Sequence, residues 1–412
     1  MGDSDRSLQH LPFFEALAGM DESSGAWKSL SAGLVTLRLF DRWIDGAGVD
    51  AWSLSAVRES ILELAPTDKF RALLSSIADA IENCRRANIT TLAPRLMAYA
   101  RALHFDAKWH LASDVYRTVL AHALPADDVD LIIAANLQLG GCYRLLAEWS
   151  EASLAFAAAE ETASMRGDIM NVLRARMAEA RLTIERGNFQ KADQMLLAAI
   201  GSAEERGFSE VRSLAMLDRA TIAYRQQDFS RSVRLNYDAL SGLREQKDRD
   251  RTLSDLAVSF YELGLRSAAR DAHLIVAATA CEQYMRWVAS VNLMEIAAAD
   301  GCEPVFEQYR RELSSAALPP WVLAQFHYFV GQGYRAFDRV DAAKLALQRA
   351  VDVAERHELF QVLFMAERAL EEIRDGGVVI VARARASEYV PESEVAEVAD
   401  AVRRMRTMAG VA

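Results

Sequence analysis

The amino-acid sequence predicts an all-α protein in which paired helices stack into an α-α superhelix, a solenoid of repeats. The 412 residues include 20 Gly and 8 Pro, so these two types make up 28 of 412 residues, or about 7%, against roughly 12% on average. Apolar residues recur at helical spacing along most of the chain, and small residues recur every 40 positions. Scarce turn formers and a fixed period favour long paired helices over strands.

The overall composition is that of a globular protein, with 51% hydrophobic and 25% charged residues. The 47 basic and 58 acidic residues give a formal net charge of −11, which excludes a basic protein that coats nucleic acid. The four cysteines show no C-x-x-C spacing, so the sequence predicts neither a disulfide framework nor a thiolate zinc site. This use of cysteine predicts a cytoplasmic location. No apolar run approaches the roughly 20 residues that cross a bilayer, and no export or lipid signal is recognisable.

The N-terminal residues 1–91 do not follow the 40-residue period. Leu30, Leu34 and Leu37 nevertheless have helical spacing, and so do several later apolar residues. We expect this segment to form a helical N-terminal cap on the array that follows.

Residues 92–374 carry the repeats. Two small positions recur every 40 residues and lie twelve apart: Ala100, Gly140, Ala180 and Ala220 at the first, and Ala112, Ala152, Ala192 and Ser232 at the second. Small side chains at such positions let two helix backbones approach closely, while a large side chain fills the groove beside them. The segment is therefore expected to be an array of helix pairs.

Two units carry further features at fixed spacing: Leu139-Gly140, Tyr143, Trp149, Ala152, Phe156 and Ala159 in one, and Val330-Gly331, Tyr334, Ala343, Leu347 and Ala350 in the other. These units resemble the tetratricopeptide repeat (TPR) family. The resemblance implies a right-handed superhelix whose groove binds peptides. The period near 40, against about 34 in the standard repeat, is similar to the elongated repeats of bacterial transcription-activator sensor regions and peptide-responsive regulators. Asn236 departs from the family, which prefers Leu or an aromatic there.

After the last unit, residues 359–373 are expected to form a terminal helix that covers the end of the stack. The tail, residues 375–412, differs in composition. Its β-branched stretch 378–386 predicts a short strand, and Val395, Val398, Val402 and Met405 predict a final amphipathic helix. Two alternatives remain open for this helix, since it could shield the repeat stack or contact another chain.

Reactive groups are scarce in the sequence. Phosphate-loop, nucleophile-elbow and metalloprotease motifs are absent, and no two of the seven histidines are spaced to share a helical face. Cys142 is expected to be a small core residue, because no His or Lys lies near it along its own helix. The sequence therefore predicts no catalytic residue, no metal, no cofactor and no enzymatic activity, with an enzyme subunit as a remote alternative.

The family resemblance implies that the first helix of each unit lines the groove. Carried over to this chain, the groove-facing positions are Arg101, His104, Arg144, Arg174, Arg181, Tyr224, Arg225, Arg251, Tyr261, Tyr328 and Arg335. Guanidinium groups pair with carboxylates, and tyrosines supply flat apolar area, so an acidic or C-terminal-carboxylate peptide would suit this lining. Ordinary solvated helix faces remain the alternative, because only 6 of the 47 basic residues are Lys and Arg is common everywhere.

The leading prediction is a non-enzymatic interaction scaffold that binds a peptide or protein segment in the groove. The alternative is a sensor for signalling or transcription regulation that responds to a ligand or peptide. Nucleic-acid binding is disfavoured by the acidic composition, and no membrane contact is expected.

Overall fold

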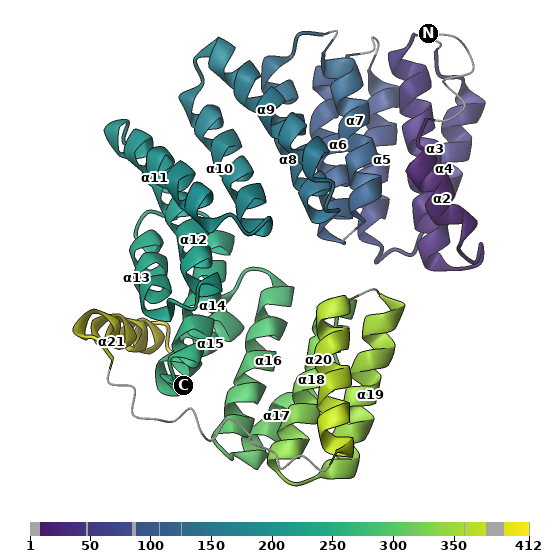
Figure 1. The fold of residues 1–412 in the computed structure, drawn as a ribbon. Coiled ribbons are helices and arrows are strands. Elements are labelled where there is room, and N and C mark those ends of the chain that lie inside the picture. Colours follow the sequence, from purple (N-terminus) through teal and green to yellow (C-terminus); the bar gives the residue numbers. More distant parts are fainter. Residues whose placement is uncertain are drawn as a thin grey trace. The chain divides into compact units, whose positions relative to one another are not determined.

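The computed structural model describes residues 9–46, 48–84, 88–106, 108–124, 126–316, 318–357, 359–375 and 391–411. All the helices and strands in these ranges are α-helices, α2 to α21 (Figure 1), which confirms the all-α prediction. The predicted strand at 378–386 lies outside the described residues. The chain divides into two compact units, unit 1 (Met1–Met195) and unit 2 (Leu196–Ala412), which are described separately.

The helices of unit 1 are α2 (Leu11–Ala18), α3 (Gly25–Ile44), α4 (Ala51–Leu62), α5 (Lys69–Asn83), α6 (Ile89–Phe105), α7 (Trp109–Ala123), α8 (Val129–Leu145), α9 (Trp149–Arg166) and α10 (Ile169–Glu185). Helix α11 (Phe189–Glu205) contains the boundary between the units. The helices of unit 2 are α12 (Ser209–Arg225), α13 (Phe229–Leu240), α14 (Gln246–Glu262), α15 (Arg266–Thr279), α16 (Gln283–Ala299), α17 (Glu303–Ser314), α18 (Pro320–Ala336), α19 (Val340–Arg356), α20 (Phe360–Arg374) and α21 (Ser393–Met408).

The 40-residue period arises from two helices of similar length joined by tight connections. From Val129 to Phe229, α8 to α13 begin every 20 residues, and α8, α10, α11 and α12 each have 17 residues. Left-handed residues end these helices, among them Ala147, Gly187 and Gln227, which lie 40 apart. The amide following each one bonds back to a carbonyl of the last helical turn, as in a Schellman cap. Sequence at the connections thus sets the step of the array.

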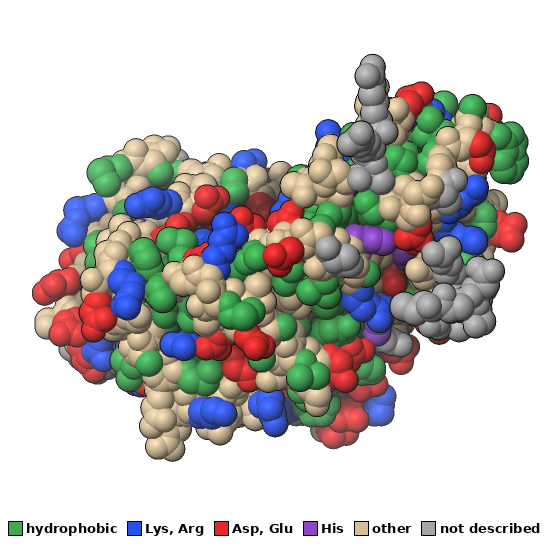
Figure 2. All heavy atoms as spheres, turned by 90° about the horizontal axis from the view of Figure 1, so that it is seen from above, with side chains coloured by type: hydrophobic (Ala, Val, Ile, Leu, Met, Phe, Trp, Pro, Cys, Tyr) green, Lys and Arg blue, Asp and Glu red, His purple; other side chains and the backbone are tan. Residues whose placement is uncertain are grey.

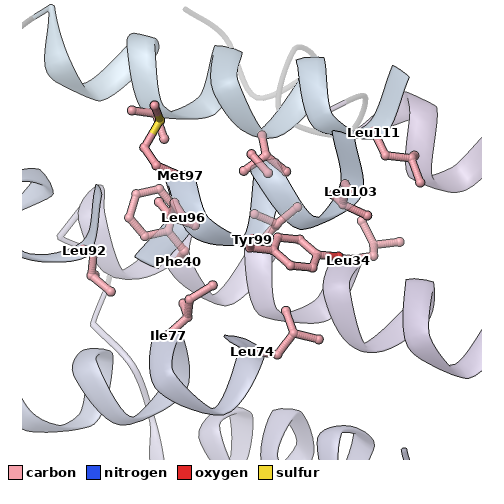
Figure 3. Close-up of a cluster of buried hydrophobic side chains, with 14 of the residues drawn as sticks. Leu34, Phe40, Leu74, Ile77, Leu92, Leu96, Met97, Tyr99, Leu103 and Leu111 are labelled. Carbon is pink, nitrogen blue, oxygen red and sulfur yellow. The ribbon is translucent and has the colours of Figure 1, made fainter. Parts of the chain in front are cut away.

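The N-terminal helices share one hydrophobic core with the first helix pair of the array. Leu34, Phe40 and Ile77 pack with Leu96 and Tyr99 in the close-up of Figure 3. Helix α2 lies against α3 and α7. The core of unit 1 therefore runs without a break from the N-terminal helices into the repeats.

In unit 2, successive helices pack as neighbours from α12 to α20. Helix α17 is short, with Pro304 in its first turn, at the unit whose sequence is degenerate. Helix α20 packs against α19 and α18 and buries Ala366 beside Ala350, as expected of a terminal helix. No helix in the described part of the chain combines the length and apolar character needed to cross a membrane.

The final helix α21 folds back onto its own chain. It lies against α13 and α15, and Val395, Val398 and Val402 join the core that these helices form. An ion pair between Arg406 and Asp271, 2.7 Å apart, fixes its C-terminal part. Of the two alternatives left open by the sequence, the structure therefore shows docking on the repeat stack.

Candidate binding site

The predicted groove residues all lie on the first helix of a pair; we call α6, α8, α10, α12, α14, α16 and α18 the first helices. In unit 1 these helices carry Arg101, His104, Arg144, Arg174 and Arg181, and in unit 2 they carry Tyr224, Arg225, Arg251, Tyr261, Tyr328 and Arg335. First helices of neighbouring pairs contact one another, as α8 does with α6 and α10. Each unit therefore brings its own set of side chains together.

In unit 1, α6 and α8 place a histidine beside a cysteine. Nδ1 of His104 lies 3.3 Å from Sγ of Cys142. Burial raises the pKa of the Cys142 thiol to about 12, and burial together with Arg144 lowers the pKa of His104. Both groups are therefore neutral near pH 7, and the thiol is not activated as a nucleophile. Sequence reasoning missed this contact because His104 comes from another repeat.

The arginines of unit 1 differ in their surroundings. The guanidinium of Arg144 pairs with Glu185 at 3.4 Å, across one repeat. Arg101 and Arg174 are exposed, and Arg174 also donates a hydrogen bond to Asn171. Arg181 is half-buried. This surface thus contains both guanidinium groups and a carboxylate that partly neutralises them.

Unit 2 gathers its tyrosines around an acidic residue that the sequence did not single out. Tyr261 on α14 donates a hydrogen bond to Glu295 on α16. Burial and, to a smaller degree, Glu262 outweigh the lowering effect of the Tyr261 hydrogen bond and raise the pKa of Glu295 to about 7. The charge of Glu295 also acts on Tyr224 and Tyr328, whose own pKa values are raised first by burial. Side chains on α12, α14 and α18 are therefore close enough to Glu295 on α16 for its charge to act on them.

A second acidic group lies on α14. The guanidinium of Arg251 is 3.7 Å from the carboxylate of Asp255. Burial raises the pKa of Asp255; Arg251 lowers it, and the buried Asp218 on α12 raises it. The sequence prediction included Arg251 but neither Asp255 nor Glu295. The position of these two acidic residues on first helices is the signal in the sequence that could have identified them.

Arg335 is turned into the packing between α18 and α20. It is 9% exposed, donates a hydrogen bond to the side-chain oxygen of Gln332 at 3.2 Å, and pairs with Glu372 at 3.1 Å. Arg225 is exposed, at the C-terminal end of α12. Arg335 therefore offers a ligand less access than the other predicted residues do.

No group of three His, Cys, Asp or Glu side chains that could hold a metal occurs among the described residues. On the face shown in Figure 2, basic and acidic side chains are interspersed with apolar ones. That face has no broad area of a single charge, so contacts there would act locally.

No protein-family model matches the sequence, and no curated protein matches it. Among solved structures, the chain is similar to the Rap conjugation gene regulator of the plasmid pLS20 in complex with the Phr* peptide, with a TM-score of 0.51, 11% identity, and coverage of 81% of this chain and 98% of that chain. It is also similar to the apo form of the quorum sensor NprR from B. thuringiensis, with a TM-score of 0.48, 14% identity, and coverage of 84% and 96%. The first likeness supports a helical-repeat fold; membership of the TPR family stays a prediction.

Proposed function

We propose that this protein binds a peptide or protein segment on its first helices and acts as a peptide-responsive regulator. The proposal rests on the cluster around Glu295 in unit 2. Tyr224, Tyr261 and Tyr328 are half-buried there, so each offers a flat apolar surface and a hydroxyl group. Tyrosine provides such contact area at a low cost in conformational entropy, as in antibody binding sites.

The fold supports the same proposal in two ways. Stacked repeats hold successive first helices in place, so most of the ordering on binding falls on the ligand. In addition, the Rap regulator with the similar fold was solved in complex with a peptide. We propose that the repeat stack tightens around the bound ligand. This change would alter how unit 1 or α21 contacts a partner protein, which is how binding would regulate the partner.

The acidic character predicted for the ligand is proposed here for unit 1 only. Arg144 and Arg181 lie on its first helices and suit a carboxylate. In unit 2 the half-buried carboxyl groups of Asp255 and Glu295 would repel one when they are ionised. The two units are thus expected to select ligand groups of opposite charge.

We propose no chemical step for this chain. The nearest arrangement to a nucleophile, Cys142 beside His104, has a thiol whose raised pKa keeps it protonated. The cytoplasmic location predicted from the cysteines is part of the proposal.

Retention of peptides from a randomised hexapeptide pool, followed by isothermal titration of those retained, would test the function. Arg144→Ala and Arg181→Ala should each lower the affinity for acidic peptides roughly tenfold, because a hydrogen bond to a charged group is lost. Arg403→Ala is the matched control, because this arginine lies on α21 and is 64% exposed. If acidic peptides bind every variant equally well, Arg144 and Arg181 are not part of the binding site. If no peptide is retained from the pool, the proposal that this protein binds peptides is wrong.

Small-angle scattering would test the regulatory part. We expect a smaller radius of gyration when a retained peptide is bound. An unchanged radius would leave a binding scaffold without a conformational response.

A further inference from the structure

A small cavity of about 220 Å³ lies among α12, α13 and α14 in unit 2. Its lining residues are Ala220, Thr221, Tyr224, Ser232, Asn236, Arg251, Asp255, Val258 and Ser259. Pockets for drug-sized ligands have volumes of roughly 300–1,000 Å³, so this one suits a single side chain or a small ion.

The cavity occurs where one repeat departs from the packing of the others. In the pair α8–α9, a Cβ atom on Gly140 would overlap the ring of Phe156. In the pair α18–α19, a Cβ atom on Gly331 would lie 2.6 Å from Leu347. The residue equivalent to Phe156 and Leu347 in the pair α12–α13 is Asn236, which is smaller and polar. A groove that is sealed in those two repeats is open in this one.

Hydrogen bonds at the base of the cavity run in one direction. The Ser259 hydroxyl donates to the Asp255 carbonyl at 2.9 Å, so Ser232, 3.0 Å away, must donate to Ser259. Asn236 Nδ2 then donates to Ser232 at 3.3 Å. This chain fixes the orientation of the amide and leaves Asn236 Oδ1 without a partner among the described residues, although Asn236 is only 1% exposed.

Two further lining residues, Thr221 and Asp255, also present acceptors, whereas the Arg251 guanidinium is a donor that lies 3.7 Å from the Asp255 carboxylate. The hydroxyl proton of Thr221 is directed at the Leu217 carbonyl. Asp255 contributes its carboxylate, with Asp218 close enough to act on it, and Arg251 is the one cation in the lining. Ala220, Val258 and the ring of Tyr224 supply apolar walls. The cavity thus has an acceptor-rich interior and room for an apolar stem.

We propose that this cavity is a subsite for a positively charged, hydrogen-bond-donating group, an ammonium or guanidinium on a short apolar stem, carried by the peptide ligand. The group would donate to Asn236 Oδ1 and to the Asp255 carboxylate, and its stem would lie along Tyr224. The inference rests on the proposed function, because it assigns the cation to a peptide. It adds that Asn236, on a second helix, helps to select the ligand.

Small cations test the subsite without a peptide. n-Butylammonium and n-butylguanidinium are added to the full chain, with n-pentanol as the neutral control, and binding is followed by ligand-detected NMR. Both cations should bind the wild type and n-pentanol should not. Asn236→Leu introduces the residue found 40 positions earlier, at Leu196, and should abolish binding. The proposal is overturned if the cations do not bind the wild type, or if they bind Asn236→Leu as tightly as the wild type.

Two further variants separate loss of the subsite from loss of the fold. Asn236→Asp keeps the size of the side chain and adds a negative charge, so it should bind the cations more tightly than the wild type. Asn136→Leu is the matched control, since Asn136 is also buried in a helix but donates only to the Ile132 carbonyl of its own helix. It should bind like the wild type; equal losses in Asn136→Leu and Asn236→Leu overturn the assignment.

Peptides then identify the source of the cation. In hexapeptides retained by the wild type, each Lys or Arg is replaced by norleucine, and the N-terminus is acetylated in a separate set. One of these changes should weaken binding roughly tenfold to a hundredfold, and should have little effect on Asn236→Leu. If none does, the subsite is not used by the peptide. A pool from which nothing is retained defeats the proposed function, while the small cations still decide the subsite.

Discussion

The helix pairs α8–α9 and α12–α13 follow the same 20-residue step but differ in how their grooves are filled. Phe156 covers Gly140 so closely that no Cβ atom fits there. Asn236, at the equivalent position, is accompanied by a cavity of about 220 Å³ beside Ala220. The two pairs therefore share the same backbone step, while the side chain at this position is large and closely packed in one pair and lines a cavity in the other.

Two buried polar side chains, one in each unit, differ in how their hydrogen-bonding groups are satisfied. In unit 1, His10 is 4% exposed and both ring nitrogens are engaged, with Asp114 at 2.6 Å and Asp41 at 2.8 Å. In unit 2, Asn236 keeps an acceptor without a partner. A satisfied buried group stabilises the place where it sits, whereas an unsatisfied one costs stability that a ligand can restore.

The largest expected effect comes from emptying the packed pair. Phe156→Ala should lower the free energy of unfolding by about 3–5 kcal/mol, because it removes a buried aromatic side chain and leaves a cavity. Asn236→Ala should cost about 1 kcal/mol, since it removes one hydrogen bond from a site that is already open. Urea unfolding followed by circular dichroism measures both. Equal losses would contradict the difference in packing.

The next effect concerns His10 and pH. Burial alone would lower the pKa of His10, but hydrogen bonds to Asp114 and then Asp41 outweigh it and raise the pKa to about 9. The raised value favours the folded state by about 3 kcal/mol below pH 6.5, the ordinary pKa of histidine, and this contribution is lost as the pH rises through about 9. The free energy of unfolding should therefore fall between pH 6.5 and 9.

His10→Gln should remove most of that slope, since glutamine does not titrate. His110→Gln is the control, because His110 is exposed on α7. Urea unfolding at pH 6, 7.5 and 9 gives the dependence of the free energy of unfolding on pH for the wild type and for each of the two variants. If His10→Gln followed the wild-type profile, the Asp41–His10–Asp114 contact would not be the source of the pH dependence.

A smaller effect is expected from overfilling the packed pair. Gly140→Ala places a methyl group against the Phe156 ring and should cost about 1–2 kcal/mol, because overpacking outweighs the gain in helix propensity. In the double variant Gly140→Ala with Phe156→Leu, part of that loss should return. Urea unfolding of the four proteins forms a double-mutant cycle, and additive losses would show that these residues do not touch.

Much of the fold could be predicted from the sequence, because helical periodicity and small residues every 40 positions are local signals. The final helix was also recognisable from Val395, Val398 and Val402, although its docking on α13 and α15 was not. That docking depends on which apolar surfaces remain open once the repeats have stacked. No pattern within α21 contains this information.

The candidate site could be predicted only in part. The sequence placed tyrosines and arginines on first helices, but pairs such as Arg144–Glu185 and His104–Cys142 join residues about one repeat apart. Such contacts depend on the register between neighbouring pairs. Asn236 was recognised as a departure from the family, yet the sequence could not show that the space around it stays open. The raised pKa that makes Glu295 notable is caused first by burial, which depends on the tertiary structure.

The smallest effect lies in the connections within the two pairs that differ. Ala147 and Gln227 adopt left-handed backbone angles, with φ of 58° and 62°, whereas Gly187 at the same place in the pair between them has φ of 80°. Side chains with a Cβ atom are strained in this region, by about 1 kcal/mol or more. Gln227→Gly should therefore raise the free energy of unfolding by roughly 0.5–1 kcal/mol, and Gly187→Ala should lower it by a similar amount. Urea unfolding measures both, and Gln227→Gly should leave cation binding in the Asn236 cavity unchanged, because the turn does not line it. A loss of stability in Gln227→Gly would mean that the glutamine makes contacts at the turn that outweigh its backbone strain.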